Sequence, residues 1–482
     1  MKSPLCIPDN QNRFTGGFPI KANPKGAKAL KQLSALNIWD MLESNPVFFV
    51  SSSFGQKDIR NKERKLLEVE PGLESDELIV YTENVMGFVS VEGQQIQIYS
   101  RFDSFGHENK ERQKETKDFF LMHMLSMVCG VSQSTLPSTL SNEHVFDFYS
   151  LFFPKLLKDA MCQGLFRAYQ KYEYNDMRVK GQVDISRHLR TNIPFNGRVA
   201  YSSREYDSDN YVTQLLRHTI EYLKTKPIGQ QVLGRDSETR AAVSMIIKAT
   251  PTYDTKLLKS VFQKNTSKPV SHPYYNKYIH LQQLCLAILQ HKKLSFGGNS
   301  NKQIHGILFD GAWLWEEYVA VLLKQKFKHY TSKSAFCLFE RDGKPFQEII
   351  PDYLSLEDNA DGGKKGVADA KYMFLHGDHL PAERACAVYY KTIMYMLRFK
   401  SKKGFLFHPF LSTYYMKDET ESSYESSVKE LNIIDNEGAK LYTVGLEIPS
   451  YNTDEEFSVF QKKMQSKEKD FQYQISRYME DG

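Results

Sequence analysis

Three ionisable residues stand inside apolar segments in the last third of the chain. Asp352 follows a proline in "IIPDYLSL", and Asp369 and Lys371 lie in "GVADAKYMF". Residues two apart in a β-strand point to the same face, so Asp369 and Lys371 would project together while Ala370 points to the opposite layer. If the two segments pair across the "EDNADGGKK" turn between them, Asp352 can reach the same place.

This grouping has a chemical consequence. Two carboxylates and an ammonium group are costly to bury unless another charge compensates them. A divalent cation is the natural compensator, and carboxylate oxygens suit Mg²⁺ or Mn²⁺. The pattern therefore predicts a metal site at Asp352 and Asp369, with Lys371 beside it.

A further acid belongs to the segment "GAWLWEEYVAVLLKQKF", whose apolar spacing is typical of a helix. Glu316 stands against the apolar stripe of this helix, whereas Glu317 leans toward Lys324, so Glu316 is predicted to be the more inward acid. The stripe consists of Trp315, Tyr318, Val319 and Leu322. A Glu on a helix, an Asp after Pro and an Asp-x-Lys on the next strand together resemble the PD-(D/E)XK nuclease core.

An alternative without chemistry stays open for the charged residues. Neighbouring strands of an exposed antiparallel hairpin often carry opposite charges that form cross-strand salt bridges. The apolar flanks of Asp352 and Asp369, the inward Glu316 and the helix that follows favour a buried site over this alternative.

The elements around the candidate site indicate an α+β protein of several domains. After a loop at 295–303, helical and strand-like segments alternate as expected for a mixed α/β domain. Upstream, residues 76–102 have the alternation of a β-meander or small barrel, and 143–172 reads as one or two helices. A strand pair is predicted at 177–185 and 197–207. We expect a β-rich part at 1–135, a mainly helical part at 136–295 and a nuclease-like domain at 296–482.

Composition limits the class of protein. The 482 residues include 41% hydrophobic and 25% charged residues, which is ordinary for folded soluble proteins. The net charge of +5 permits a polyanionic partner without requiring one. No run approaches eighteen apolar residues, the six cysteines are far apart, and the start of the chain does not resemble a signal peptide. These features predict a cytoplasmic protein without a membrane partner.

The motifs also carry a narrower resemblance. In order and spacing, "GILFDGAWLWEEYVAVLLK", "IIPDYLSL", "ADAKY", "YYKTIMYMLRF" and "GFLFHPF" resemble the nuclease half of McrC, the endonuclease subunit of McrBC-type restriction systems, including the related LlaJI-like systems. More loosely, "YTENVMGFVSVEGQQIQIYSRF" is similar to the N-terminal barrel strands of that family. The segments "VKGQVDISRHL" and "SDNYVTQLLRHTI" resemble its middle region. The first 75 residues and those after 415 match nothing in the family pattern.

The resemblance implies metal-dependent cleavage of double-stranded DNA. Asp352, Asp369 and the carbonyl of Ala370 would hold Mg²⁺ or Mn²⁺, with Glu316 supporting the metal, and Lys371 would orient the attacking water or stabilise developing charge. Where the family usually has Gln in the helix after the Asp-x-Lys strand, this chain has Lys391. Either Lys391 would contact the scissile phosphate or assist the water, or the position is relaxed in this chain.

The resemblance also implies a partner. McrC-like proteins dock their N-terminal part into a hexameric McrB-type AAA+ GTPase and stimulate its hydrolysis. This sequence contains no G-x-x-x-x-G-K-[ST] loop, so the partner would bind GTP. A different function stays open, that of a non-catalytic adaptor that keeps the fold and only regulates the AAA+ protein.

Two clusters of basic residues are candidates for contacts with the DNA backbone. The first follows the nuclease motifs and consists of Arg398, Lys400, Lys402 and Lys403. The second lies in "MRVKGQVDISRHLR", with Arg198 and Arg204 nearby. The second cluster is equally consistent with a surface that faces the motor protein.

Overall fold

The structure is a computed structural model. It describes residues 4–13, 16–38, 40–41, 48–50, 65–74, 77–91, 94–103, 117–129, 145–234, 236–294, 305–330, 336–375, 386–411, 427–434, 438–452 and 454–480. The contacts divide the chain into two compact units. Unit 1 combines Met1–Met41, Val50–Ser141 and Asn301–Gly482, and unit 2 combines Leu42–Phe49 with Asn142–Ser300. The fold is therefore α+β with more than one domain, as the sequence predicts.

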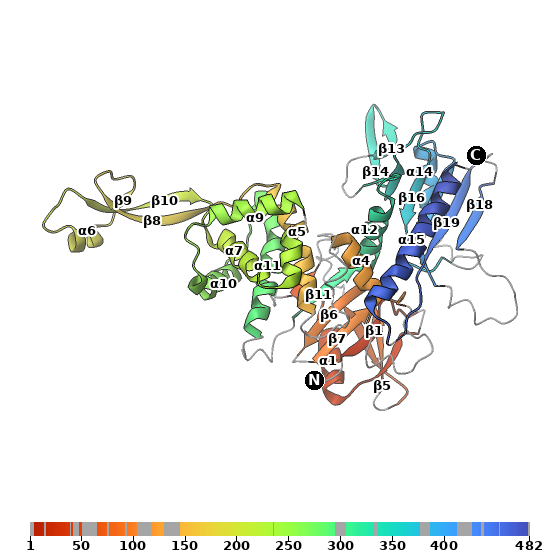
Figure 1. Ribbon diagram of the computed structural model, residues 1–482, viewed down its shortest axis with the longest axis horizontal. Coiled ribbons are helices and arrows are strands. Elements are labelled where there is room, and N and C mark those ends of the chain that lie inside the picture. The colour runs from red at the N-terminus through yellow and green to blue at the C-terminus, as the bar shows by residue number, and fades with distance from the viewer. Residues whose placement is uncertain are drawn as a thin grey trace. The chain divides into compact units, whose positions relative to one another are not determined.

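The elements of unit 1 come from both ends of the chain (Figure 1). In the N-terminal part they are β1 (Leu5–Pro8), β2 (Phe18–Lys21), α1 (Pro24–Ser34), β4 (Leu67–Pro71), β5 (Glu77–Thr82), β6 (Val85–Val91), β7 (Gln94–Tyr99) and α4 (Phe119–Cys129). In the C-terminal part they are β11 (His305–Asp310), α12 (Gly311–Leu323), β12 (Phe327–His329), β13 (Phe336–Arg341), β14 (Lys344–Ile349), β15 (Tyr353–Ser355), β16 (Val367–Ala370), a short π-helix (Cys386–Tyr390), α14 (Lys391–Arg398), β17 (Lys403–Phe410), β18 (Val428–Asn432), β19 (Lys440–Glu447) and α15 (Phe457–Glu480). The strand β3 (Phe48–Val50) lies at the boundary between the two units in the sequence.

A six-stranded sheet carries the candidate site residues. Its order is β12-β15-β16-β17-β19-β18, in which β16, β17 and β19 are parallel and the other pairings are antiparallel. Neighbouring residues of β17 point to opposite faces. The ring of Phe407 lies 5.6 Å from that of Phe471 in α15, whereas Leu406 packs in one cluster with Met396 of α14. Helices α15 and α14 therefore cover opposite faces of the sheet.

A second sheet joins the N-terminal strands to the start of the C-terminal part. In it β1 pairs in parallel with β7, and β7, β6 and β11 continue in antiparallel order. The close approach of β6 and β11 requires glycine at position 87, because a Cβ there would meet the Ile307 carbonyl oxygen at 2.0 Å. Asp310 ends β11 and accepts hydrogen bonds from the backbone N–H groups of Ala312 and Trp313, which starts α12. The site helix is thus anchored to the N-terminal strands. A third sheet has the order β2-β5-β4.

Unit 2 is mostly helical. Its elements are α5 (Val145–Met161), β8 (Ala168–Asp176), β9 (Gln182–Val183), α6 (Ile185–Thr191), β10 (Val199–Asp207), α7 (Tyr211–Leu223), α8 (Pro227–Gly234), α9 (Ser237–Ala249), a 3₁₀ turn (Thr255–Leu257), α10 (Leu258–Ser267), a second 3₁₀ turn (Pro273–Tyr275) and α11 (Lys277–Leu294). The long strands β8 and β10 pair over their whole length and form an arm that extends away from the helices of this unit, with β9 and α6 near its tip (Figure 1).

Several sequence expectations need correction. The helix predicted through 172 ends at Met161, because Gly164 with φ +80° breaks it and the alternating stretch from Ala168 forms β8. Most of 177–185 is not a strand, and β10 pairs mainly with β8. The strands predicted within 76–102 are present as β5, β6 and β7. The loop at 295–303 lies outside the described residues, and the three-part division of the chain stays a prediction.

Candidate active site

The structure brings Asp352 and Asp369 together on neighbouring strands. The antiparallel register pairs Tyr353 with Ala368, so Asp352, which immediately precedes β15, is level with Asp369 in β16. Asp352 Oδ2 accepts a hydrogen bond of 2.8 Å from the backbone N–H of Ala370. Asp352 lies in a bend and not in a strand, because Pro351 has no N–H with which to continue the ladder from β14.

Two lysines converge on Asp369, whose side chain is fully buried. Lys371 Nζ forms an ion pair with Asp369 Oδ2, and Lys391 Nζ lies 3.3 Å from Asp369 Oδ1. Lys371 shares a strand face with Asp369, whereas Lys391 reaches it from the first residue of α14. Although Lys371 touches it, Asp369 Oδ2 has no hydrogen bond of normal geometry. A carboxylate oxygen with one ammonium partner keeps a second lone pair that a further ligand could use.

Neighbouring carboxylates crowd negative charge around Asp352. Burial raises the pKa of Asp352 well above its ordinary value, and the charges of Asp369 and Glu316 raise it further, against the opposing effect of Lys391. Burial works against the charge of Lys391, but the carboxylates of Asp369 and Asp352 hold the pKa of this ammonium group above its ordinary value. The acidic groups are thus crowded enough to gain from a divalent ion.

Glu316 lies near this cluster, and its carboxylate has a partner of its own. His329 Nε2 in β12 lies 2.7 Å from Glu316 Oε1, and the Tyr353 hydroxyl donates to the Glu316 carbonyl at 2.5 Å. Glu317 instead accepts a 3.2 Å hydrogen bond from the indole N–H of Trp313. Of the two acids, Glu316 is the one whose charge most affects Asp352. His329 escaped sequence reasoning because a lone histidine beyond a helix has no diagnostic spacing.

The donor set fits a hard divalent cation. Within the described ranges, no group of three or more His, Cys, Asp or Glu side chains is arranged to hold a metal. The carboxylates of Asp352 and Asp369 are two adjacent oxygen donors, and the Ala370 carbonyl as a third stays a prediction. Mg²⁺ prefers oxygen ligands and keeps several waters, so one or two carboxylates are sufficient for it. The place of Glu316 as a metal ligand stays a prediction.

The first basic cluster is only partly available to DNA. Lys403 Nζ donates to the carbonyls of Tyr478 and Met479 in α15, at 3.0 and 3.2 Å. Arg398 Nε donates to the carbonyl of Cys337 at 2.7 Å, although its side chain is exposed. Lys400 and Lys402 are exposed. Lys403 is thus a structural contact for α15.

Comparison with known proteins assigns the family. A family model of McrBC 5-methylcytosine restriction system components matches residues 80–409, and the chain belongs to this family. None of the curated proteins compared with it matches. One similar solved chain comes from a refined half-complex of the tetradecameric assembly of Thermococcus gammatolerans McrB AAA+ hexamers with bound McrC. It is 14% identical, with a TM-score of 0.44 over 96% of this chain and 99% of that chain.

Another similar chain comes from the cryo-EM structure of the Thermococcus gammatolerans McrBC complex. It is 13% identical, with a TM-score of 0.29 over 67% of this chain and 88% of that chain. The family assignment rests on the family model, and it confirms the resemblance read from the sequence motifs. Among the described helices, none is long and apolar enough to cross a bilayer.

Proposed function

We propose that this chain is the endonuclease subunit of a McrBC-type restriction system and hydrolyses phosphodiester bonds of double-stranded DNA. The observation that carries the proposal is the buried Asp369, which lies beside Asp352 and between two lysines at the end of a central strand. This arrangement, with Glu316 on the preceding helix, supports a PD-(D/E)XK nuclease fold. Membership in the McrBC family supports the same function.

The residues of the site have separate roles in this proposal. Asp352, Asp369 and the Ala370 carbonyl would hold Mg²⁺ or Mn²⁺, which supplies Lewis acidity and lowers the pKa of a bound water. Lys371 orients the attacking water and stabilises negative charge that develops on the phosphate. Lys391, whose side chain is 38% exposed, contacts the scissile phosphate.

The proposal includes a McrB-type AAA+ hexamer as partner. Binding and hydrolysis of GTP belong to that protein, because this sequence has no phosphate-binding loop. The tip of the β8–β10 arm is the surface that we assign to the partner. Helix α6 buries none of its residues, and apolar side chains are exposed around it at Met177, Ile185, Leu189, Ile193 and Phe195. Apolar surface of this kind is typical of a protein contact.

The family resemblance instead predicts docking through the N-terminal β-rich part, residues 1–135. Strands β6 and β7 bury most of their side chains, and β6 pairs with β11 within unit 1. A contact surface in this region would therefore have to come from its other elements. Docking by residues 1–135 stays a prediction beside the proposed role of the arm.

Cleavage of plasmid DNA tests the catalytic part of the proposal. The wild-type chain with Mg²⁺, the AAA+ partner and GTP should cut, and Asp369→Asn should abolish cutting by removing a charge from the centre of the site. Asp358→Asn is the matched control. Asp358 is an exposed acid that pairs with Lys364 at 2.6 Å in the turn between β15 and β16. Cutting by the control at the wild-type rate would show that the loss is specific to the site.

Adaptor function without catalysis is the competing outcome. If the wild-type chain raises the GTP turnover of its partner but never cuts DNA under any Mg²⁺ or Mn²⁺ condition, the nuclease proposal is wrong and the adaptor function is correct. Cutting by wild type and by Asp369→Asn alike would show that the site lies elsewhere.

A further inference from the structure

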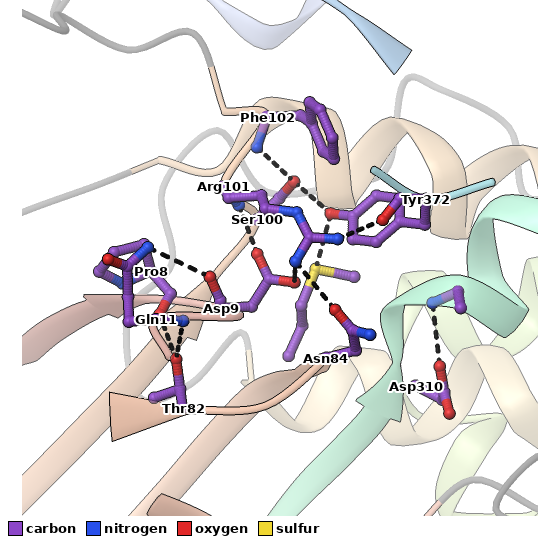
Figure 2. A network of polar contacts seen from close by, with 12 residues as sticks. Pro8, Asp9, Gln11, Thr82, Asn84, Ser100, Arg101, Phe102, Asp310 and Tyr372 are labelled. Carbon is purple, nitrogen blue, oxygen red and sulfur yellow. Dashed lines mark hydrogen bonds and ion pairs between the residues drawn. The ribbon is translucent and has the colours of Figure 1, made fainter. Parts of the chain in front are cut away.

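A buried arginine that follows strand β7 reaches the segment just after β16, the strand that carries Asp369. Arg101 follows β7, and its side chain is only 8% exposed. Its guanidinium donates to Asn84 Oδ1 at 2.8 Å and to the backbone carbonyl of Tyr372, and it lies 3.5 Å from Asp9 Oδ2 (Figure 2). Tyr372 immediately follows Lys371. One side chain therefore links the N-terminal strands to the end of the active-site strand.

Tyr372 is held by more than this one hydrogen bond. Its hydroxyl lies 2.6 Å from Ser100 Oγ, its ring lies beneath the Arg101 guanidinium at 4.7 Å, and its edge meets the ring of Phe102 at 4.9 Å. Figure 2 shows Ser100, Arg101 and Phe102 gathered around Tyr372. Ser100, Arg101 and Phe102, which follow β7, thus hold Tyr372 in place.

The arginine is itself fixed in place. The backbone N–H of Arg101 donates to Asp9 Oδ1 at 2.6 Å, and Asp9 is fully buried at the end of β1. On the other side of Tyr372, the N–H of Lys371 donates to the Phe407 carbonyl at 2.8 Å. The backbone around Lys371 is therefore held from both sides, by β17 and by the N-terminal sheet.

Stability alone does not account for this network. Burying an arginine and an aspartate costs free energy, and well-packed apolar residues of similar volume are often as stabilising or more so. A planar guanidinium fixes its partners relative to one another, because its N–H groups point in fixed directions. Catalysis needs such geometry, since displacement of a catalytic group by about 1 Å can cost about 100-fold in rate.

We propose that Arg101, held by Asp9 and Asn84, is a positioning residue that fixes the backbone beyond Lys371 and so makes the geometry of the nuclease site depend on the N-terminal sheet. This inference rests on the proposed nuclease function for its kinetic consequence. Its structural consequence is that Arg101 orders the backbone at the end of β16, and this consequence does not depend on cleavage.

Arg101→Lys is the informative variant. It keeps the positive charge beside Asp9 but lacks the fork that reaches Asn84 and the Tyr372 carbonyl together. Arg13→Lys is the matched control, because Arg13 also pairs with acids, Glu68 and Glu70, but on the surface of β4. Tyr372→Phe is the second variant, which keeps the ring packing and removes the hydroxyl with its contacts to Ser100 Oγ and Met86 Sδ.

Two measurements are made on the full chain. Hydrogen exchange followed by mass spectrometry should show faster exchange in peptides covering 367–375 for Arg101→Lys, with β19 unchanged. With partner, GTP and Mg²⁺, the maximal cleavage rate should fall at least about 10-fold while the DNA concentration at half-maximal rate changes less than about 2-fold. Tyr372→Phe should change both quantities in the same direction by less, and Arg13→Lys should change neither.

The outcomes separate this inference from the proposed function. Unchanged exchange at 367–375 in Arg101→Lys overturns the inference whether or not the protein cuts DNA. A rate that falls only in proportion to the unfolded fraction also overturns it, because a purely structural residue would act in that way. If wild type never cuts but the exchange changes as expected, the ordering role stands and the nuclease proposal fails.

Discussion

Lys391 Nζ lies 3.3 Å from Asp369 Oδ1, although the lysine begins a helix and the aspartate lies in a strand 22 positions earlier. The contact ties α14 to β16 at the candidate site. With Lys371 on the other oxygen, one buried carboxylate is shared by two ammonium groups. The site thus contains more positive charge than the Asp-x-Lys motif alone supplies.

The role of Lys391 can be tested by changing its charge and its hydrogen-bonding capacity separately. Lys391→Met should lower the cleavage rate by about 100-fold, because it removes a donor that faces the phosphate. Lys391→Gln should lower the cleavage rate less than Lys391→Met does, since an amide N–H can still donate to Asp369. Single-turnover cleavage with saturating partner measures both. Equal rates for the two variants would show that hydrogen bonding at this position is irrelevant.

The two adjacent glutamates of α12 should differ in importance. Glu316→Gln should lower the cleavage rate by about 10- to 100-fold, because Glu316 is engaged by His329 and acts on Asp352. Glu317→Gln should change the cleavage rate by less than about 3-fold, because the Glu317 carboxylate accepts a hydrogen bond from Trp313 of the same helix. Cleavage rates of the two variants at one Mg²⁺ concentration decide the order. The reverse order would place the wrong face of α12 at the site.

Asp9 should give unit 1 a specific dependence of stability on pH. Burial raises the pKa of Asp9 to about 6, against the opposing effect of Arg101 and with a smaller contribution from Asp310. The folded state therefore binds more protons than the unfolded state between about pH 4 and pH 6, so the free energy of unfolding falls as pH rises through this window. Two pKa units correspond to about 3 kcal/mol.

Comparison with Asp9→Asn isolates this contribution. The variant should lack the fall, so its free energy of unfolding relative to that of wild type should rise by about 2 kcal/mol from pH 4.5 to pH 7. Urea unfolding followed by tryptophan fluorescence reports on unit 1, because Trp313 and Trp315 both lie in α12 of this unit. Parallel pH profiles for the two proteins would contradict the prediction.

The tip of the arm should matter for the partner and not for the nuclease site. Ile185→Asp and Phe195→Asp each place a charge on exposed apolar surface, and each should weaken the stimulation of GTP hydrolysis about 10-fold or more. Ile434→Asp is the control, since Ile434 is an exposed isoleucine in the turn after β18, outside both the arm and residues 1–135. GTP turnover is measured against chain concentration. Loss of stimulation by the control and the arm variants alike would refute a specific arm contact.

Much of the candidate site followed from local sequence periodicity. Alternation along a strand placed Asp369 and Lys371 on one face, and the turn between the two segments placed Asp352 beside them. These arguments use only neighbours in the sequence and the register of one antiparallel pair. The helical stripe that contains Trp315 and Tyr318 is likewise buried as its spacing predicted.

Contacts between distant segments could not be read in the same way. Arg101 and Tyr372 are 271 positions apart, and neither has a neighbour pattern that identifies the other. The long strand β8 was missed because its alternation of tyrosines and charged residues serves an exposed arm with no apolar face to signal a strand. Burial at a site is decided by the whole fold, whereas periodicity reports one element at a time.

The pairing of β6 with β11 has a consequence for biosynthesis. The partner residues Gly87 and Leu308 are roughly 220 residues apart, and at roughly 5–20 residues per second β6 would leave the ribosome on the order of ten to forty seconds before β11. The larger segment of unit 2, Asn142–Ser300, is translated in that interval and can fold first. Until β11 arrives, one edge of β6 is an unpaired strand, so the nascent chain would be most exposed to aggregation in this period.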